Sequence, residues 1–216
     1  MAEPTIPTGV FAPIACGRRR VRRGLIVSHK QRAIPPLTYP TPLTIGVVAD
    51  THVLAHGRRR LPMEVLALFQ RFEVDLILHA GDVCTPSVLT ALSGVAPTFA
   101  VQGNGDELEL TRSLPLVIRL TVGPFSIVLL HGHTGRTARV AAREYAGKAD
   151  CVIYGHSHIA MIESVDETIL FNPGSATDRR WQAHFGIGLI EVSDDGIEPE
   201  LILYDDPRHL ESIVPD

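Results

Sequence analysis

The sequence predicts a layered α/β fold, and three observations support this class. Short runs rich in β-branched residues recur from Leu43 onward, and most of them end in Gly, Asp, Asn or His. The stretches between these runs show helical periodicity, and alternation of strands with helices is typical of layered α/β proteins. The chain has 216 residues, of which 45% are hydrophobic and 20% are charged, so it can form one domain with a sizeable core.

The first part of the domain contains two predicted strand–helix units. A strand over 43–49 precedes a helix over 61–72, in which valine, leucine and phenylalanine form one apolar stripe. A strand over 75–79 precedes a second helix, which Thr85 caps and Gly94 ends. A proline directly after the capping threonine suits the first helical position, because no amide hydrogen is needed there.

The second part contains a hairpin and several further strands. After a strand over 98–101, two strands over 116–121 and 125–130 flank a Val-Gly-Pro sequence, so we expect an antiparallel hairpin. A helix is expected over 137–146. The remaining strands are predicted at 151–154, 167–171, 186–192 and 201–204. The elements contain no internal repeat and predict a mixed sheet system.

Charge is distributed unevenly along the chain. Residues 1–41 contain six arginines and one lysine against Glu3, a net charge of +6, so that the remainder carries −10 of the total of −4. Prolines also interrupt any regular element there. We expect a basic, Pro-rich, poorly ordered N-terminal extension over 1–41 and a folded domain over 42–216. The acidic domain argues against broad nucleic-acid binding, although the extension itself could touch nucleic acid or a membrane surface.

Cysteine usage and hydropathy indicate the compartment. Cys16, Cys84 and Cys151 are far apart and show no CxxC spacing, so we expect neither a disulfide framework nor a cysteine zinc site. No apolar run approaches the roughly 20 residues that span a bilayer, and the start of the chain lacks the pattern of a signal peptide. We therefore expect a soluble, cytoplasmic protein without a membrane partner, whose oligomeric state the sequence leaves open.

Polar residues follow five of the predicted strands, at the point where each strand ends. Loops at the ends of strands in an open α/β sheet meet at one edge, so residues far apart in sequence can share one site. Carboxylate, amide and imidazole groups are ligands that zinc and first-row divalent metals accept. The five motifs are Asp50-Thr51-His52, Gly81-Asp82, Gly103-Asn104-Gly105-Asp106, His131-Gly132-His133 and Gly155-His156-Ser157-His158.

Each of these motifs alone has an ordinary explanation in a turn, but their combination does not. Packing does not require polar groups at the ends of five apolar strands, so together they predict a metal site. In Asp50-x-His52 and His156-x-His158 we expect both side chains to point to the same side of an extended segment. The glycines beside the ligands are expected to allow positive φ angles and close backbone approach.

In order and spacing, the motifs resemble the signature of the calcineurin-like metallophosphoesterase family, in its small bacterial and archaeal branch without a cap domain. The resemblance covers roughly residues 43–207 and includes an Asn-Pro-Gly-Ser sequence at 172–175. It implies a four-layer αββα sandwich of two mixed β-sheets flanked by helices. It also implies a metal-dependent phosphoesterase with two divalent metal ions that activate a water for attack on phosphorus. We expect manganese first, and iron, zinc or nickel as alternatives.

The resemblance also assigns roles to single residues. One metal ion would bind Asp50, His52, Asp82 and His158, and the other would bind Asp82, Asn104, His131 and His156. Asp82 would therefore bridge the two ions. Asp82 and Asn104 would both take part in catalysis, and Asn104 would also contact the substrate.

Gly105 departs from the family pattern. Family members that cleave demanding monoesters and phosphoproteins usually have His at this position, where it protonates the leaving group or stabilises the transition state. Its absence favours phosphodiesters or activated esters, whose leaving groups depend less on a protein acid. His133 and His56 are candidates to replace it in part, and a structural role for His133 is the main alternative. Arg58, the first of three consecutive arginines, is a candidate for binding the substrate phosphate, and Asp106 is expected to orient a ligand or cap a helix.

Three functions follow from this interpretation. The first is hydrolysis of small phosphodiesters. The second is a nuclease acting on RNA or DNA, with the basic extension as a tether, and the acidic domain argues against it. The third is a metal-free scaffold, because the retromer coat contains a subunit of this fold that has lost catalytic ligands. All seven expected ligand positions are filled in this chain, which argues against a scaffold.

Overall fold

The structure is a computed structural model that describes residues 37–135 and 137–215, all within one compact unit over 32–216. The strands are β1 (Leu37–Tyr39), β2 (Leu43–Val48), β3 (Leu76–His79), β4 (Thr98–Ala100), β5 (Val117–Val122), β6 (Phe125–Leu130), β7 (Cys151–Tyr154), β8 (Met161–Val165), β9 (Thr168–Asn172), β10 (Phe185–Val192) and β11 (Ile197–Tyr204). The helices are α1 (Met63–Arg71), α2 (Pro86–Ser93), α3 (Leu108–Ser113), α4 (Ala138–Arg143) and the 3₁₀ helix η1 (Pro207–Ser212).

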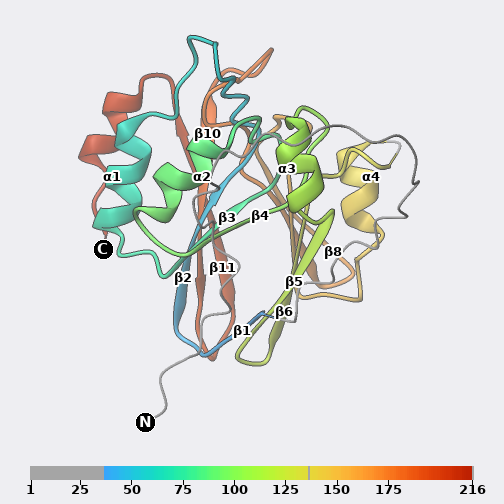
Figure 1. The fold of residues 1–216 in the computed structure, drawn as a ribbon. Helices are drawn as coiled ribbons and strands as arrows, with labels where there is room; N and C mark the ends of the chain where they lie inside the picture. The colour runs from blue at the N-terminus through green and yellow to red at the C-terminus, as the bar shows by residue number, and fades with distance from the viewer. Residues whose placement is uncertain (1–36, 136, 216) are drawn as a thin grey trace, which may run out of the picture. The chain divides into compact units, whose positions relative to one another are not determined.

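The strands form two mixed sheets. The six-stranded sheet has the order β1-β5-β6-β7-β9-β8, and the five-stranded sheet has the order β11-β10-β2-β3-β4. Strands β2, β3 and β4 are parallel to one another, as are β6, β7 and β9. Figure 1 shows that the loops after β2 and after β9 lie at the same upper edge of the two sheets. This edge carries the polar motifs.

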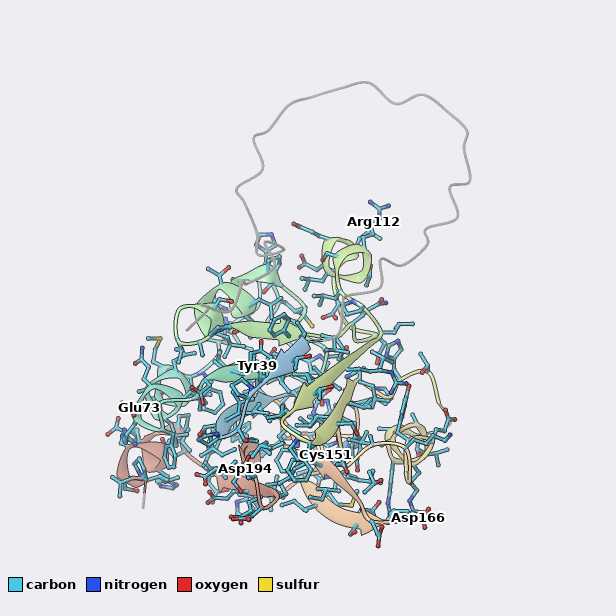
Figure 2. The ribbon with its side chains drawn as sticks, turned by 90° about the horizontal axis from the view of Figure 1, so that it is seen from below. Tyr39, Glu73, Arg112, Cys151, Asp166 and Asp194 are labelled. Atoms are coloured by element: carbon cyan, nitrogen blue, oxygen red, sulfur yellow. The ribbon has the colours of Figure 1, made fainter. Side chains whose placement is uncertain are left out.

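Helices cover the outer face of each sheet, which gives four layers. Helices α1, α2 and η1 lie against the five-stranded sheet and α4 lies against the six-stranded sheet, as Figure 2 shows from below. Three hydrophobic cores fill the spaces between the layers. On β6, Ile127 and Leu129 face the other sheet, whereas Val128 and Leu130 face α4, because side chains alternate along a strand. The predicted αββα sandwich is confirmed.

Most predicted elements are present, and the differences have local causes. Strand β1 lies inside the predicted extension, where it joins the edge of the six-stranded sheet beside β5. Prolines on both sides are compatible with an edge strand. The boundary at residues 41 and 42 is therefore corrected, since 37–41 belong to the domain, and residues 1–36 of the predicted extension lie outside the described residues. Strand β8 has no predicted counterpart, because its residues are half-buried or exposed and form no apolar run.

Helix α3 and the 3₁₀ helix η1 also have no predicted counterpart. Each covers only six residues and buries a single leucine, so neither produces a periodic apolar stripe. None of the helices in the described part of the chain is long and apolar enough to cross a membrane.

Candidate metal centre

The loops that follow the parallel strands bring the predicted motifs together. The amide of Asp50 donates a hydrogen bond to the Gly81 carbonyl at 3.0 Å, and the amide of His52 donates to the Asp82 carbonyl at 3.0 Å. These bonds continue the pairing of β2 with β3 beyond the ends of both strands. The first two motifs are therefore held side by side by the backbone itself.

Asp50, His52 and His158 form the first candidate metal triad, with ligand atoms within 4.8 Å of one another. The Nε2 atoms of His52 and His158 are 3.2 Å apart, and Oδ1 of Asp50 is 3.5 Å from Nε2 of His158. Oδ2 of Asp50 accepts a hydrogen bond from the His156 amide, whereas Oδ1 is buried without a hydrogen-bond partner among the described residues. An unpaired buried carboxylate oxygen is costly, and a cation bound between Oδ1 and the two imidazoles would satisfy it.

Asp82, His131 and His156 form the second candidate triad, again with ligand atoms within 4.8 Å. Oδ1 of Asp82 is 3.4 Å from Nε2 of His131. Its other oxygen, Oδ2, is 3.4 Å from Nε2 of His52 in the first triad. The Asn104 side-chain oxygen lies 3.3 Å from Nε2 of His131. The Asp82 carboxylate therefore faces both triads, one oxygen to each, and the Asn104 amide adjoins the second.

The hydrogen bonds of two histidines set tautomers that suit metal binding. Nδ1 of His131 donates a hydrogen bond to the Ala80 carbonyl at 2.7 Å, and Nδ1 of His158 donates to the Asp178 carbonyl. A carbonyl oxygen only accepts, so Nδ1 carries the proton in both rings and the neutral ring has its lone pair on Nε2. Both Nε2 atoms lie in the triads, where a metal ion would need that lone pair.

Five of the candidate ligands have a left-handed backbone conformation. The φ angles are 51° at Asp50, 44° at His52, 54° at Asp82, 67° at His156 and 59° at His158. The expectation that the Asp-x-His and His-x-His motifs are extended is therefore wrong. Each motif leaves its strand through a sharp turn, and the turns aim the side chains at one centre. Non-glycine residues rarely adopt this conformation, so the surrounding structure must hold it in place.

The loop after β9 provides much of this support. The Ser175 hydroxyl, in the predicted Asn-Pro-Gly-Ser motif, donates a hydrogen bond to the Asp50 carbonyl at 2.7 Å. Asp178, whose carbonyl orients His158, forms an ion pair with Arg59 at 3.2 Å. Arg59 also donates to the His52 carbonyl at 3.4 Å. The first triad is thus clamped between the loops that follow β2 and β9.

Glycines allow the backbone to pass very close to the ligands. A Cβ atom on Gly103 would lie 2.1 Å from Oδ1 and 2.2 Å from the amide nitrogen of Asp82. One on Gly155 would lie 2.5 Å from a backbone carbonyl. Four glycines beside the ligands, at 81, 103, 132 and 155, are expected to allow positive φ, and Gly81 and Gly132 have it, with angles of 87° and 93°. Gly103 and Gly155 are needed for close approach instead.

Burial and neighbouring charges shift the pKa values of the cluster. Burial raises the pKa of Asp50 to about 8 and lowers the pKa of His158 to about 4. Burial also lowers the pKa of His52. Burial alone would lower the pKa of His131, but its hydrogen bond to Asp82 and the nearby carboxylates raise it above the ordinary value. Metal binding would therefore displace protons from Asp50 and His131.

The other predicted site residues differ in how close they lie to the triads. The His133 ring centre is 5.3 Å from that of His131 and 6.5 Å from that of His156, and its buried Nδ1 has no hydrogen-bond partner among the described residues. Arg58 and His56 are exposed, and their side chains make no hydrogen bond or ion pair within 37–135 and 137–215. Of the three consecutive arginines, Arg59 rather than Arg58 contacts the site loops.

Asp106 joins two site loops and does not cap a helix. Its carboxylate accepts hydrogen bonds from the Cys84 amide at 2.8 Å and from the Gly103 amide at 2.7 Å. Helix α3 begins two residues later, at Leu108, with Glu107 as its N-cap residue and no side-chain capping bond. Asp106 therefore fixes the loop after β4, which carries Asn104, against the loop after β3.

Arg180 is a residue near the site that sequence reasoning did not identify. Its positive charge contributes to lowering the pKa values of Asp50 and His52, which places it near the first triad. It is exposed, has a φ angle of 49°, and makes no hydrogen bond or ion pair with another residue of the described ranges. The available signal was a pair of arginines shortly after the Asn-Pro-Gly-Ser motif.

Comparison with known proteins identifies the family. Residues 43–195 match the family model described as the calcineurin-like phosphoesterase superfamily domain. The chain belongs to this family. A "probable metallophosphoesterase" of Methanothermobacter thermautotrophicus is 36% identical to this calcineurin-like phosphoesterase over 166 residues, which cover 74% of the chain and 92% of the relative. A phosphodiesterase of Methanocaldococcus jannaschii is 25% identical over 144 residues, which cover 61% of the chain and 83% of the relative.

Solved structures share the fold of this phosphoesterase at lower sequence identity. A Vps29 of Entamoeba histolytica in complex with Zn²⁺ superposes with a TM-score of 0.60 and 23% identity, covering 76% of this chain and all of that chain. An archaeal phosphodiesterase superposes with a TM-score of 0.61 and 24% identity, covering 75% of this chain and all of that chain. These likenesses show the fold alone. The family is metal-dependent, and the two candidate triads supply side chains suited to metal ions.

Proposed function

We propose that this calcineurin-like phosphoesterase is a dinuclear, metal-dependent phosphodiesterase that acts on small phosphodiesters. The observation that carries the proposal is the position of Asp82, whose two carboxylate oxygens lie 3.4 Å from His52 and 3.4 Å from His131. A carboxylate that faces two triads is suited to hold two cations close together. The named phosphodiesterase among the relatives supports the same class of reaction.

The assignment of ligands follows the two triads. One cation would be held by Asp50, His52, Asp82 and His158, and the other by Asp82, Asn104, His131 and His156. When bound, the two cations would supply positive charge for the phosphoryl oxygens and would activate a water. We propose manganese as the physiological metal. Iron, zinc and nickel accept the same mixture of carboxylate and imidazole ligands and are the alternatives.

Side chains around the triads would position the substrate. The Asn104 amide is exposed beside the second triad and can donate hydrogen bonds to a phosphoryl oxygen. Arg180 would attract the phosphodiester anion to the first triad, and Arg58 remains a second candidate for this role. His133 lies beside the second triad, so it is the proposed donor of a hydrogen bond to an ester oxygen of the substrate.

Gly105 supports a preference for diesters over monoesters. Its amide donates a hydrogen bond to Oδ1 of Asp82 at 2.6 Å, and a Cβ atom there would lie 3.2 Å from the same oxygen. The position therefore helps to hold Asp82 and provides no side chain that could protonate a leaving group. Substrates with good leaving groups and one negative charge on phosphorus need that protonation least.

Hydrolysis of bis(4-nitrophenyl) phosphate with added Mn²⁺ tests the proposal. The wild-type protein should cleave this diester faster than 4-nitrophenyl phosphate, should bind about two metal ions per chain, and should lose activity on chelation. Asp82→Asn should reduce kcat/KM by at least about a hundredfold and lower the bound metal. Asp150→Asn is the matched control. Asp150 directly precedes β7, its carboxylate accepts hydrogen bonds from the amide and hydroxyl groups of Ser126, and it does not contact the triads.

Three outcomes would redirect the assignment. Wild-type activity and two bound metals in Asp82→Asn would refute the role of Asp82 between the ions. A metal-free wild-type protein without hydrolytic activity would favour the scaffold alternative. Cleavage of RNA or DNA that weakens on removal of residues 1–36, which leaves β1 in place, with unchanged cleavage of small diesters, would favour the nuclease alternative.

A further inference from the structure

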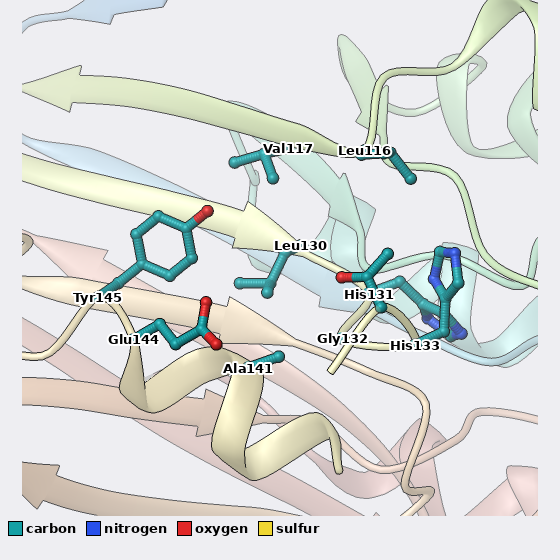
Figure 3. A pocket seen from close by; sticks show the side chains of 10 residues that line it. Leu116, Val117, Leu130, His131, Gly132, His133, Ala141, Glu144 and Tyr145 are labelled. Atoms are coloured by element: carbon teal, nitrogen blue, oxygen red, sulfur yellow. The ribbon is translucent and has the colours of Figure 1, made fainter. Parts of the chain in front are cut away.

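A cavity of about 120 Å³ lies beside the second triad, on the side of the six-stranded sheet that α4 covers. Figure 3 shows it between the start of β5, the end of β6 and the residues at the end of α4. Val117, Leu130 and Ala141 supply apolar walls, and Glu144 and Tyr145 supply polar groups. These five residues, together with the loop at 131–133, are called the α4 cavity below.

The α4 cavity shares a wall with the candidate metal centre. The loop at 131–133 lines the cavity, and within it His131 belongs to the second triad. The His133 ring lies 5.3 Å from the His131 ring and also lines the cavity, as Figure 3 shows. A Cβ atom on Gly132 would lie 2.9 Å from the Cα atom of Ala138, so this wall packs tightly against α4. A phosphodiester at the second triad could therefore place one ester group in the cavity.

The size of the cavity limits what it can hold. An engineered protein cavity of roughly 150 Å³ accommodates benzene, so about 120 Å³ suits a group of a few carbon, nitrogen or oxygen atoms. A short alcohol fits this volume, whereas a nucleoside is much larger. The apolar walls favour the carbon atoms of such an alcohol.

The polar lining indicates a hydrogen-bond donor on the ligand. The Glu144 carboxylate accepts hydrogen bonds only, and within 37–135 and 137–215 no cation forms an ion pair with it. Tyr145 adds a hydroxyl group, and the guanidinium of Arg119 lies 5.2 Å from its ring centre, which fixes the ring. Glu144 is exposed, and its carboxylate could accept a hydrogen bond from an ammonium or hydroxyl group of a ligand in the cavity.

We propose that the α4 cavity binds one ester alcohol of the substrate, and that this alcohol is short and carries an ammonium or hydroxyl group. The inference rests on the proposed phosphodiesterase activity and deepens it, because it names the substrate class. The other ester oxygen leaves during hydrolysis. Substrates of this class are phosphodiesters of small amino alcohols or polyols, and nucleotides lie outside it.

A series of 4-nitrophenyl phosphodiesters with a common leaving group tests the cavity. The second alcohol is ethanol, 2-aminoethanol, ethylene glycol or thymidine linked through its 5′ oxygen. The wild-type protein should have kcat/KM values about tenfold higher for the aminoethyl or hydroxyethyl ester than for the ethyl ester, and lower values for the thymidine ester. The aminoethyl and hydroxyethyl arms distinguish an ammonium ligand from a hydroxyl ligand.

Two variants and one control make the test specific. Glu144→Gln should reduce the ratio of aminoethyl to ethyl kcat/KM from about ten to about one, because it removes the anionic acceptor. Ala141→Leu fills the cavity and should raise KM more for the aminoethyl and hydroxyethyl esters than for the ethyl ester. Glu198→Gln is the control, since Glu198 is an exposed residue of β11 and should leave every ratio unchanged.

The outcomes separate the cavity from the proposed function. If the wild-type protein does not hydrolyse any of the diesters with metal, the phosphodiesterase assignment fails and the cavity inference falls with it. If it hydrolyses them, but the ethyl and thymidine esters equal or exceed the aminoethyl and hydroxyethyl esters, the cavity inference alone is wrong. Equal effects of Glu144→Gln on all esters would also overturn it.

Discussion

Replacing Gly103 with alanine should disable the metal centre while leaving every candidate ligand in the sequence. The added Cβ atom would lie 2.1 Å from Oδ1 and 2.2 Å from the amide nitrogen of Asp82. Non-bonded atoms of this kind normally stay at least about 3 Å apart. A side-chain rotation cannot relieve the contact with a backbone nitrogen. One of the two loops must therefore move by about 1 Å, and a displacement of this size at a catalytic site costs about a hundredfold in rate.

The assay compares activity, metal content and stability in one set of variants. We expect Gly103→Ala to lower kcat/KM for bis(4-nitrophenyl) phosphate by at least about a hundredfold, to reduce the bound metal, and to lower the free energy of unfolding by about 1–3 kcal/mol. Gly196→Ala is the matched control, because a Cβ atom there would have no neighbour within 4 Å. Circular dichroism would show that the Gly103 variant is folded at the assay temperature.

A folded Gly103→Ala protein with two bound metals and wild-type activity would refute this reasoning. Such a result would mean that Asp82 and the loop after β4 can separate by 1 Å without loss, so that their close approach is not a requirement of the site. A loss of activity in both glycine variants would refute it as well, since the control residue lies in the turn between β10 and β11, at the opposite ends of the strands.

Three further predictions concern protons, substrate charge and packing. Because burial raises the pKa of Asp50 to about 8 and nearby carboxylates raise the pKa of His131, metal binding at pH 7 should release protons, and metal affinity should rise with pH up to about pH 8. Titration calorimetry in buffers of different ionisation enthalpy measures the release. Arg180→Ala should raise KM for phosphodiesters about tenfold, Arg180→Lys should restore part of the loss, and the control Arg208→Ala should leave KM unchanged. An effect of Arg180→Ala confined to kcat would contradict a role in attracting the substrate. Tyr204→Phe should lower the free energy of unfolding by about 1 kcal/mol in a denaturant titration, because the buried hydroxyl donates a hydrogen bond to the Ala176 carbonyl at 2.7 Å.

The layered fold could be predicted because its strands are buried on both faces. Strands such as β3 and β7 are fully buried and appear as continuous apolar runs that end at a polar motif. β1 and β8 escaped prediction for the opposite reason, since they lie at the two edges of the six-stranded sheet. An edge strand needs few apolar residues and tolerates neighbouring prolines, so its sequence differs little from that of a loop.

The candidate ligands could be predicted from the sequence, whereas their support could not. Asp50 and His158 stand in motifs with fixed spacing, and such motifs can be recognised without coordinates. Arg180 and Asp178 act from a loop that is distant in sequence, and Asp178 uses a backbone carbonyl that any residue type would provide. Asp106 could be singled out, but only the structure separates loop bridging from helix capping.

The left-handed ligands suggest why so many hydrogen bonds converge on the loops around the site. A non-glycine residue with positive φ costs of order 1 kcal/mol or more, and five candidate ligands share this conformation. Bonds that do not involve a metal hold these turns, including Ser175 to the Asp50 carbonyl and the Asp50 carboxylate to the His156 amide. The protein therefore stores the strain in its own loops, and the ligand atoms are already gathered within 4.8 Å of one another. Because the ligand atoms need to move little when a metal binds, little of the metal's binding free energy is lost to rearrangement, and more of that free energy can stabilise the folded protein.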